Sequence, residues 1–277
     1  MSQPIAPAPG TVGSYAPHPD TSVRRLYVLL CGFEIIPRSV SLRGADPDVI
    51  LAVPITAYLL DTAEGWVLFD AGLDEANLRD PERLEALYTS QGWSPPPVVW
   101  PAHEMEGQLR RIGLGFGDIA RVVLSHLHAD HSGHLKRMPQ AVLTIQRAER
   151  DYAFSGRARA SWFPSDYDLP GLRWEVIEGD REIMPGLTAL STPGHAPGHQ
   201  SLLVTLPETG RVVLAGDVGD LVENFRDEVL PGESQDDAAA LRSIRRVNAL
   251  VADGAQLFLT HDPDLLLRLR RAPGFYG

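Results

Sequence analysis

One short segment constrains this chain more than any other: residues 125–134, which read SHLHADHSGH. It places His126, His128, Asp130 and His131 within six positions, directly after the apolar run 122–124. Three imidazoles and a carboxylate at such close spacing indicate a metal site. One cluster of this size offers too few groups to close two sites for first-row metals. Other parts of the chain are therefore expected to complete it.

The composition limits the class of protein. The 277 residues are 44% hydrophobic and 22% charged, which is a globular balance that suits one large domain or two small ones. Cys31 is the only cysteine, so intramolecular disulfides and thiolate-rich zinc sites are excluded, and a cytoplasmic location is expected. The net charge of 25 − 36 = −11 counts against binding to nucleic acid or to an anionic membrane surface.

The N-terminal region differs from the rest of the chain. Residues 1–22 are rich in Pro, Gly and Ala and are predicted to form a flexible arm before a single domain over residues 23–277. No Lys or Arg precedes Arg24 and no apolar h-region is present, so a secretory signal is not expected. The longest apolar stretch, residues 49–60, contains Pro54 and is too short to span a bilayer.

Short apolar runs bounded by Gly, Pro and Asp recur along the chain and predict strands. We expect strands at 25–30, 55–61, 66–70, 121–124, 141–145, 173–177, 188–190, 201–205, 211–215 and 256–260. Helices are expected at 81–92, 104–112, 147–154 and 236–250, with irregular loops at 93–101 and 155–172. This order favours an α/β domain built on sheets, with its helices outside.

Three further candidate ligands each follow an apolar strand. His195 comes after 187–190, Asp217 after 212–215 and His261 after 257–260. The ends of strands are where a rigid scaffold usually carries its site residues. Long sequence intervals separate the three, so only the fold can bring them together.

The spacing predicts two neighbouring metal sites. In an extended segment His126 and His128 point to the same side and can share one ion, whereas Asp130 and His131 follow as the chain turns and can serve another. The predicted metal ligands are His126, His128, Asp130, His131, His195, Asp217 and His261. Such imidazole and carboxylate sets suit Zn²⁺, with Mn²⁺, Fe²⁺ or Co²⁺ as alternatives. Two such ions roughly 3.5–4 Å apart would deprotonate a shared water and make it a nucleophile.

Two other histidines are interpreted differently. The ligand set is complete without His134 and His199, so both are expected to form supporting hydrogen bonds. His18 and His103 are given no role.

The motifs HLHADH and TPGHAPGH, the Gly-Asp pair at 216–217 and His261 together resemble the metallo-β-lactamase superfamily. Within it, the N-acyl-homoserine lactonase group is the most similar, through residues 53–73, 175–204 and 223–232 as well. The resemblance covers roughly residues 24–265. It implies a four-layer αββα sandwich with a dinuclear site along one edge of the sheets.

The resemblance also implies an activity. The family is generally dizinc and opens lactone rings, so a quorum-quenching lactonase that acts on a small-molecule lactone is expected. It implies that His126, His128 and His195 bind one zinc ion, that Asp130, His131 and His261 bind the other, and that Asp217 bridges them. Asp130 would carry a proton from the attacking hydroxide to the leaving alkoxide. A homodimer through residues 75–100 is compatible with the resemblance.

One position departs from the family pattern. The similar lactonases carry a Tyr three residues after the bridging Asp217, and this chain has Asp220 there. An ionised carboxylate cannot donate the hydrogen bond that a phenol donates. Either Tyr152 or Tyr167 supplies a donor instead, or Asp220 recognises a donor or cationic group on a different lactone or ester. A third reading has Asp220 facing solvent or capping a turn.

Other functions remain open from the sequence. A hydrolase of another lactone, ester or thioester would share the ligands, although glyoxalase II-like enzymes have a C-terminal helical region and only 16 residues follow His261 here. True β-lactamases usually have Cys in place of Asp217, and nucleases need a basic surface. A non-catalytic metal-binding scaffold is the remaining alternative. The substrate pocket is expected to draw on residues 33–43, 93–103 and 151–167.

Overall fold

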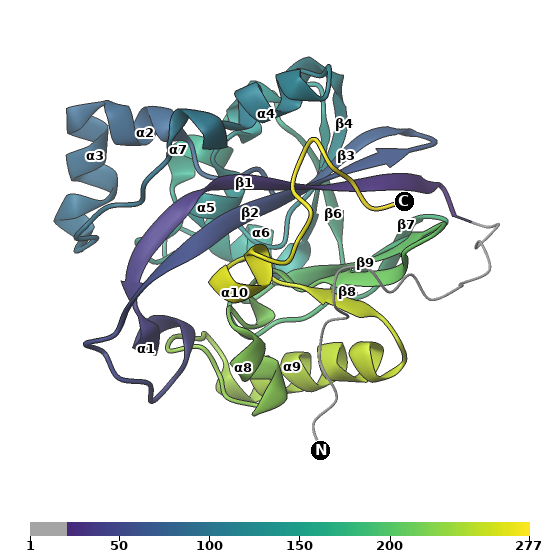
Figure 1. Ribbon diagram of the computed structural model, residues 1–277. Helices are drawn as coiled ribbons and strands as arrows, with labels where there is room; N and C mark the ends of the chain where they lie inside the picture. The colour runs from purple at the N-terminus through teal and green to yellow at the C-terminus, as the bar shows by residue number, and fades with distance from the viewer. Residues whose placement is uncertain (1–20) are drawn as a thin grey trace.

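The computed structural model describes residues 21–277 and contains two β-sheets that lie face to face between layers of helices (Figure 1). The first sheet has six strands in the order β1-β2-β3-β4-β5-β6, and the second has five in the order β11-β10-β9-β8-β7. The predicted four-layer αββα arrangement is therefore confirmed. Residues 1–20 of the predicted N-terminal arm lie outside the described part of the chain.

The strands have these bounds. The six-stranded sheet consists of β1 (Val23–Pro37), β2 (Ile50–Thr62), β3 (Gly65–Phe69), β4 (Ile119–Val123), β5 (Val142–Gln146) and β6 (Arg173–Ile177). The five-stranded sheet consists of β7 (Arg181–Met184), β8 (Leu187–Ser191), β9 (Gln200–Leu206), β10 (Gly210–Leu214) and β11 (Gln256–Phe258). Every expected strand is present, and β7 is an edge strand that the sequence pattern did not predict.

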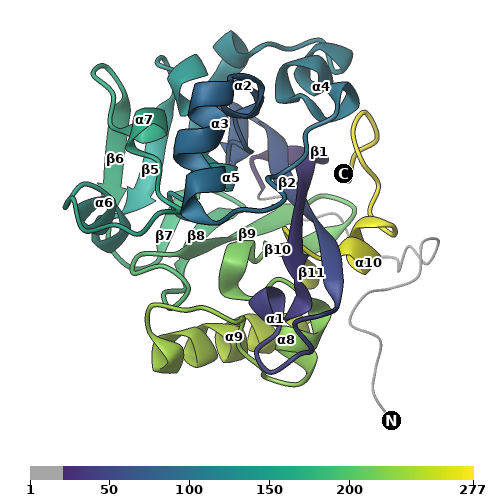
Figure 2. The same ribbon diagram turned by 90° about the vertical axis from the view of Figure 1, so that its left-hand side faces the viewer.

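The helices cover the outer faces of the two sheets. They are α1 (Arg38–Ser41), α2 (Glu75–Arg79), α3 (Pro81–Leu87), α4 (Met105–Arg111), α5 (Ala129–Ser132), α6 (Arg147–Ala153), α7 (Pro164–Tyr167), α8 (Val222–Arg226), α9 (Asp237–Ala252) and α10 (Pro263–Leu266). Helices α2, α3, α4 and α7 lie over the six-stranded sheet, and α8 and α9 lie under the five-stranded sheet (Figures 1 and 2). Asp236 caps α9 through a side-chain hydrogen bond to the amide of Ala239.

Alternating side chains on the strands build three apolar layers. Leu29 of β1 packs under the outer helices, and its neighbour Val28 packs between the two sheets. Val213 of β10 faces α9, and Leu214 faces the opposite sheet. This alternation follows from the period of two along a strand, and it leaves each sheet buried on both faces.

Strands β1 and β2 form a hairpin, and both extend well beyond their predicted lengths. The two strands pair from Val23 with Thr62 to Pro37 with Ile50, so the far half of the hairpin reaches past the rest of the sheet. It carries α1 to the opposite side of the molecule, next to α8 and α9 (Figure 2). The backbone amide of Arg43 donates to Leu230 there, which fixes the tip. The hairpin thus forms a wall beside the strand ends that hold the candidate ligands.

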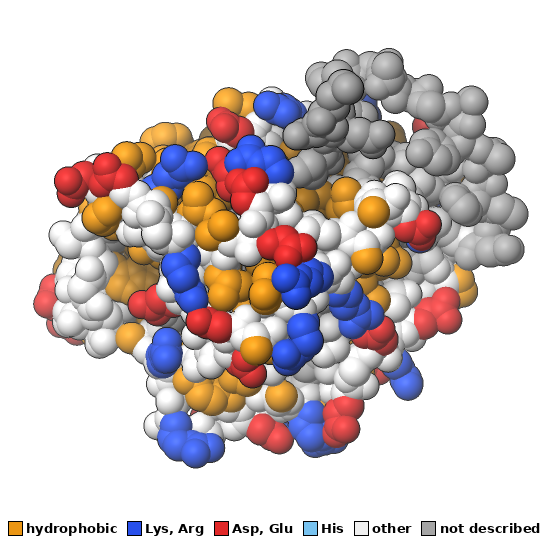
Figure 3. All heavy atoms as spheres, turned by 90° about the horizontal axis from the view of Figure 1, so that it is seen from below, with side chains coloured by type: hydrophobic (Ala, Val, Ile, Leu, Met, Phe, Trp, Pro, Cys, Tyr) orange, Lys and Arg blue, Asp and Glu red, His pale blue; other side chains and the backbone are white. Residues whose placement is uncertain are grey.

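Two further observations concern membrane-spanning helices and surface charge. Within residues 21–277, no helix combines the length and the apolar character needed to cross a membrane. Seen from the side of α9, basic and acidic side chains are interspersed and form no large patch of one sign (Figure 3).

Candidate metal centre

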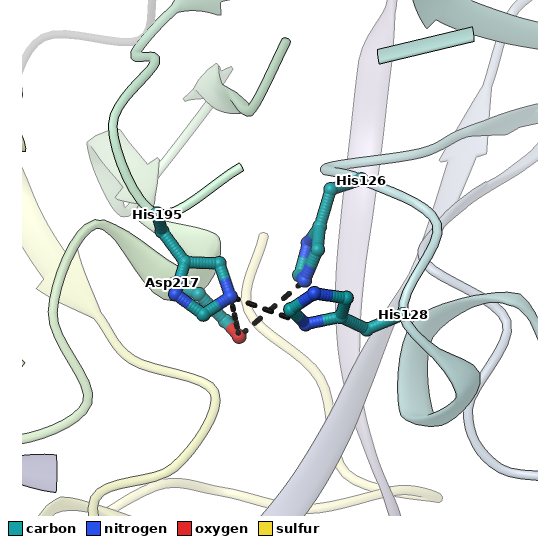
Figure 4. Close-up of side chains that lie close together, drawn as sticks. All are labelled: His126, His128, His195 and Asp217. Atoms are coloured by element: carbon teal, nitrogen blue, oxygen red, sulfur yellow. Dashed lines mark hydrogen bonds and ion pairs between the residues drawn. The ribbon is translucent and has the colours of Figure 1, made fainter. Parts of the chain in front are cut away.

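The fold brings the seven predicted ligands into two adjacent groups. The first ligand group is His126, His128, His195 and Asp217, and the second ligand group is Asp130, His131 and His261; within each, the ligand atoms lie within 4.8 Å of one another. The residues come from the loops and short helices that follow β4, β8, β10 and β11. The first group draws on both sheets, and its side chains converge on one point (Figure 4).

The facing atoms of the first ligand group are close enough to share one ion. The Nε2 of His195 lies 3.2 Å from the Nδ1 of His128. The Oδ2 of Asp217 lies 3.4 Å from the Nε2 of His195 and 3.7 Å from the Nε2 of His126 (Figure 4). His128 therefore faces its partners with Nδ1, and the other two histidines face them with Nε2.

Asp217 also reaches the second ligand group. Its Oδ2 lies 3.3 Å from the Nε2 of His131, and its Oδ1 lies 3.3 Å from the Nε2 of His261. The Oδ2 of Asp130 lies 3.1 Å and 3.5 Å from those same two nitrogens. The Asp217 carboxylate is thus in contact with both groups, which is the position that a bridging ligand requires.

The donor set fits metal ions. The Nε2 atoms of His126 and His131 and the Oδ1 of Asp217 are buried and have no hydrogen-bond partner among residues 21–277. Buried polar atoms of this kind call for a partner, and clustered imidazole and carboxylate ligands suit divalent first-row ions. Burial, together with neighbouring imidazoles, lowers the pKa of His126 and His128. Both are therefore neutral, which is the form that binds a metal.

Hydrogen bonds on the far side of the rings fix the ligands of the second group. The Nδ1 of His131 lies 2.9 Å from the Oδ2 of Asp70, whose Oδ1 accepts from the amide of Ser125 at 2.7 Å. The Nδ1 of His261 donates to the carbonyl of Pro54 at 2.8 Å. These contacts set the tautomer and leave Nε2 free to bind. Asp70 was not among the residues predicted from the sequence, although it follows an apolar strand as Asp217 does.

Glu149 is a second residue that the sequence analysis missed. Its carboxylate is fully buried in α6 and accepts from the amides of Leu127 and Gly198 and from the indole of Trp162. The ring of Trp162 in turn packs edge-on against His128, with 4.0 Å between ring centroids. Glu149 therefore joins the two loops that carry the histidines of the first ligand group.

The other two histidines have the expected supporting contacts. His199 Nδ1 lies 3.0 Å from the carbonyl of Thr192, and its Nε2 accepts from the amide of Asp217 at 2.9 Å. His134 Nδ1 lies 2.7 Å from the carbonyl of Ala71, and its Nε2 lies 2.9 Å from Glu75. His199 thus positions a candidate ligand, whereas His134 ties α2 to the loop after β3.

A cavity of about 430 Å³ opens onto both ligand groups. All three predicted segments contribute to it, and residues 91–92, 231 and 233 were not expected. The lining residues are Glu34, Ile35, Ile36, Pro37, Val40, Gln91, Gly92, Trp93, Ser94, Pro95, Pro97, His128, Asp130, Ser161, His195, Asp217, Asp220, Pro231, Glu233 and His261. The cavity thus combines an apolar wall with a polar floor.

The structure bears on the three interpretations of Asp220 that the sequence left open. Tyr167 is fully buried and donates to the carbonyl of Ala153, and Tyr152 packs on Trp162; neither lines the cavity. The expectation that one of them supplies a hydrogen-bond donor there is wrong, because their positions are fixed by packing elsewhere. Asp220 lines the cavity and is 8% exposed, so it does not face bulk solvent.

Comparison with known proteins agrees with this geometry. The family model of the metallo-beta-lactamase superfamily matches residues 50–261. The chain is 33% identical to the N-acyl homoserine lactonase AttM of Azorhizobium caulinodans, over 84% of this chain and 89% of the relative. It is 34% identical to an N-acyl homoserine lactonase of Bacillus cereus, over 87% of this chain and 94% of the relative.

Solved structures give the same result. A quorum-quenching N-acyl homoserine lactone lactonase matches with a TM-score of 0.80 and 31% identity, over 93% of this chain and 100% of that one. An N-acyl homoserine lactone hydrolase with its product N-hexanoyl-L-homoserine at the catalytic metal center matches with a TM-score of 0.79 and 30% identity, over 92% of this chain and 100% of that one. This chain therefore belongs to the metallo-β-lactamase superfamily, and within it to the family of the N-acyl homoserine lactonases.

Proposed function

We propose that this protein is a metal-dependent hydrolase that opens the ring of an N-acyl homoserine lactone or a related lactone. The observation that carries the proposal is the contact of Asp217 with both ligand groups at the floor of the cavity. Relatives of the same family, which span most of this chain, are N-acyl homoserine lactonases. Hydrolysis of another ester or of a thioester is the alternative that the same centre would allow.

The geometry supports two sets of ligands. We propose that His126, His128 and His195 hold one ion, that Asp130, His131 and His261 hold the other, and that Asp217 contacts both. When bound, two such ions would polarise the substrate carbonyl and lower the pKa of water. The donors contain no thiolate, and this set favours Zn²⁺.

We propose that Asp130 moves the proton. Its carboxylate lines the cavity, is 6% exposed and lies beside His131 and His261. In the reaction the water oxygen bonds to the carbonyl carbon and the ring carbon–oxygen bond breaks. Asp130 would accept the proton of the water and return it to the alkoxide, which gives a hydroxy acid.

The apolar wall of the cavity would bind the remainder of the substrate. Ile35, Ile36 and Val40 come from the β1 end and α1, and Trp93 comes from the loop across from them. Burial of an acyl chain against these side chains would contribute roughly 25 cal/mol for each Å² of apolar surface removed from water. It would also hold the ring near Asp130.

A ring-opening assay with a pH indicator tests the proposal. The substrates are N-acyl homoserine lactones, simple lactones, esters and thioesters, and the variant is Asp130→Asn at unchanged metal content. Loss of the proton carrier should lower kcat by about 10²–10⁴-fold. Thioester turnover alone would favour the alternative chemistry, and two bound metals with no turnover at all would indicate a non-catalytic scaffold.

We also propose a setting for this activity: zinc as the resident metal, the cytoplasm as the location and a homodimer formed through residues 75–100. The single cysteine is compatible with a reducing compartment. Trp100, which is 57% exposed at the end of that segment, supplies an apolar contact. Sedimentation of wild type and Trp100→Ser tests the dimer; a monomeric wild type would contradict it.

A further inference from the structure

The cavity above the metal centre carries negative charge that the proposed reaction does not use. Besides the candidate ligands, its lining contains the carboxylates of Glu34, Asp220 and Glu233, and none of the described lining residues is Lys or Arg. Glu233 is exposed and pairs with Arg159 at 3.7 Å. The charge of Glu233 is therefore already balanced by Arg159. Glu34 and Asp220 are the two carboxylates of the described lining that still lack such a partner.

Asp220 is a buried carboxylate with few groups nearby that could balance its charge. It is 8% exposed and lines the cavity. Among residues 21–277 its side chain forms no ion pair and accepts no backbone hydrogen bond, and the buried hydroxyl of Ser41 beside it has no hydrogen-bond partner there. A buried carboxylate without a cationic partner is costly unless a ligand supplies one.

Glu34 adds a second charge of the same kind. It lies on the half-buried end of β1 and forms no ion pair or side-chain hydrogen bond in the described part of the chain. Burial and the neighbouring carboxylates together raise its pKa to about 8. Glu34 and Asp220 are thus two carboxylates of the cavity lining that have no ion-pair partner among residues 21–277.

The segment that carries Asp220 is held firmly. The next amide, of Leu221, donates to Asn224 Oδ1 at 2.7 Å, and Asn224 Nδ2 donates to the carbonyl of Ser41 at 3.0 Å. The amide of Val222 donates to Asp262 at 2.8 Å. The Asp220 carboxylate is thus held in the cavity wall and is not free to swing into solvent. A group in a fixed position can select a ligand with little loss of entropy.

We propose that Glu34 and Asp220 bind a protonated amine of the substrate, so that the preferred substrates are lactones or esters that carry an amino group. An ammonium has three donors and can serve two carboxylates at once. The apolar wall formed by Ile35, Ile36 and Val40 accommodates the uncharged part of such a molecule. This inference rests on the proposed function, since it names the substrate class of the same site.

The test compares substrates with and without an ammonium group. The amine is placed on the ring (α-amino-γ-butyrolactone against its N-acetyl form) or at the end of the acyl chain (N-6-aminohexanoyl- against N-heptanoyl-homoserine lactone). Each kcat/KM is divided by the rate of the uncatalysed reaction and measured below the pKa of the amine. In at least one of the two pairs, the wild type should show a kcat/KM for the ammonium substrate at least tenfold above that for its uncharged partner, which corresponds to about 1.4 kcal/mol.

Two variants and a matched control test whether Asp220 and Glu34 cause this preference. Asp220→Asn and Glu34→Gln each remove one charge and should bring the ratio close to one. Glu233→Gln removes the same charge from the same cavity, but at its exposed rim, and should leave the ratio unchanged. Calorimetric binding of the non-hydrolysable α-amino-γ-lactam and its N-acetyl form gives a readout independent of turnover, and Asp220→Asn should weaken only the charged lactam.

The outcomes separate the inference from the function on which it rests. If lactones are opened with no preference for charge, the inference is overturned. The same holds if Asp220→Asn lowers both members of a pair equally and also lowers metal content, because the carboxylates then balance the charge of the metals. If no lactone, ester or thioester is opened, the proposed function fails. Selective binding of the charged lactam by wild type alone would still support the amine site.

Discussion

Replacement of Glu149 tests how the first ligand group is held in place. Its Oε1 accepts from the amide of Leu127 at 3.1 Å and from the indole of Trp162 at 2.8 Å, and its Oε2 accepts from the amide of Gly198 at 3.2 Å. Leu127 lies between two candidate histidine ligands, and Gly198 follows the third in its loop. One side chain therefore sets the separation of the two loops.

The expected magnitude for Glu149→Gln follows from these contacts. The amide oxygen can replace only one carboxylate oxygen, so its NH2 group must face at least one N–H donor. Loss of a hydrogen bond to a charged group costs about 1.5–3 kcal/mol. Burial raises the pKa of Glu149, so the neutral amide recovers part of that cost. We expect the free energy of unfolding to fall by about 1–2 kcal/mol and metal binding to weaken by roughly 10–100-fold.

Urea unfolding of the metal-free protein and competition with a chromophoric chelator measure these two quantities. Glu178→Gln is the control, because its side chain is 69% exposed and pairs with Arg147 at the surface. It should change the stability by less than about 0.5 kcal/mol. If Glu149→Gln behaved like this control in both measurements, the proposed role of Glu149 in holding the loops would be refuted.

Three other substitutions or reactions test separate parts of the structure. Asparagine can adopt the positive φ of 63° at position 70, but the side chain of Asp70→Asn cannot accept hydrogen bonds from both Ser125 and His131. Chelator competition should therefore show roughly 10–100-fold weaker metal binding. Unchanged binding would refute the role of Asp70. Gly198→Ala places a Cβ 2.1 Å from the backbone nitrogen of Glu149. Urea unfolding should therefore show a free energy of unfolding that is lower by about 1–3 kcal/mol. A variant as stable as the wild type would contradict the close approach. Cys31 is 1% exposed, and burial raises its pKa to about 12. Ellman's reagent at pH 8 should therefore react with this thiol only after denaturation. Rapid labelling of the native protein would be inconsistent with the structure.

The strands were predictable because their apolar runs are interrupted by turn residues, but β1 and β2 were predicted only in part and β7 was not predicted. The far half of β1 is half-buried and contains Glu34, so its pattern no longer reads as a strand; pairing with β2 extends it to Pro37. Strand β7 is short and largely polar because it forms the edge of its sheet. In both places tertiary pairing, which a local pattern does not contain, determines the structure.

The candidate ligands were predictable for a similar reason, since each follows an apolar strand and the ends of neighbouring strands lie close together. Glu149 was not predictable, because it lies in the polar stretch RAERDYA and two of its three donors are backbone amides. The presence of Glu34 and Asp220 in one cavity was equally hidden, because 186 positions separate them (220 − 34) and only the fold brings both to its lining.

Stepwise addition of Zn²⁺ to the metal-free protein, with bound metal and the rate of lactone opening followed in the same sample, tests the dinuclear hydrolase most directly. We predict no turnover without metal and a rate that rises until two equivalents are bound, because Asp217 contacts both ligand groups. A full rate at one equivalent, or lactone opening that persists in the metal-free protein, would contradict a reaction that needs both ions.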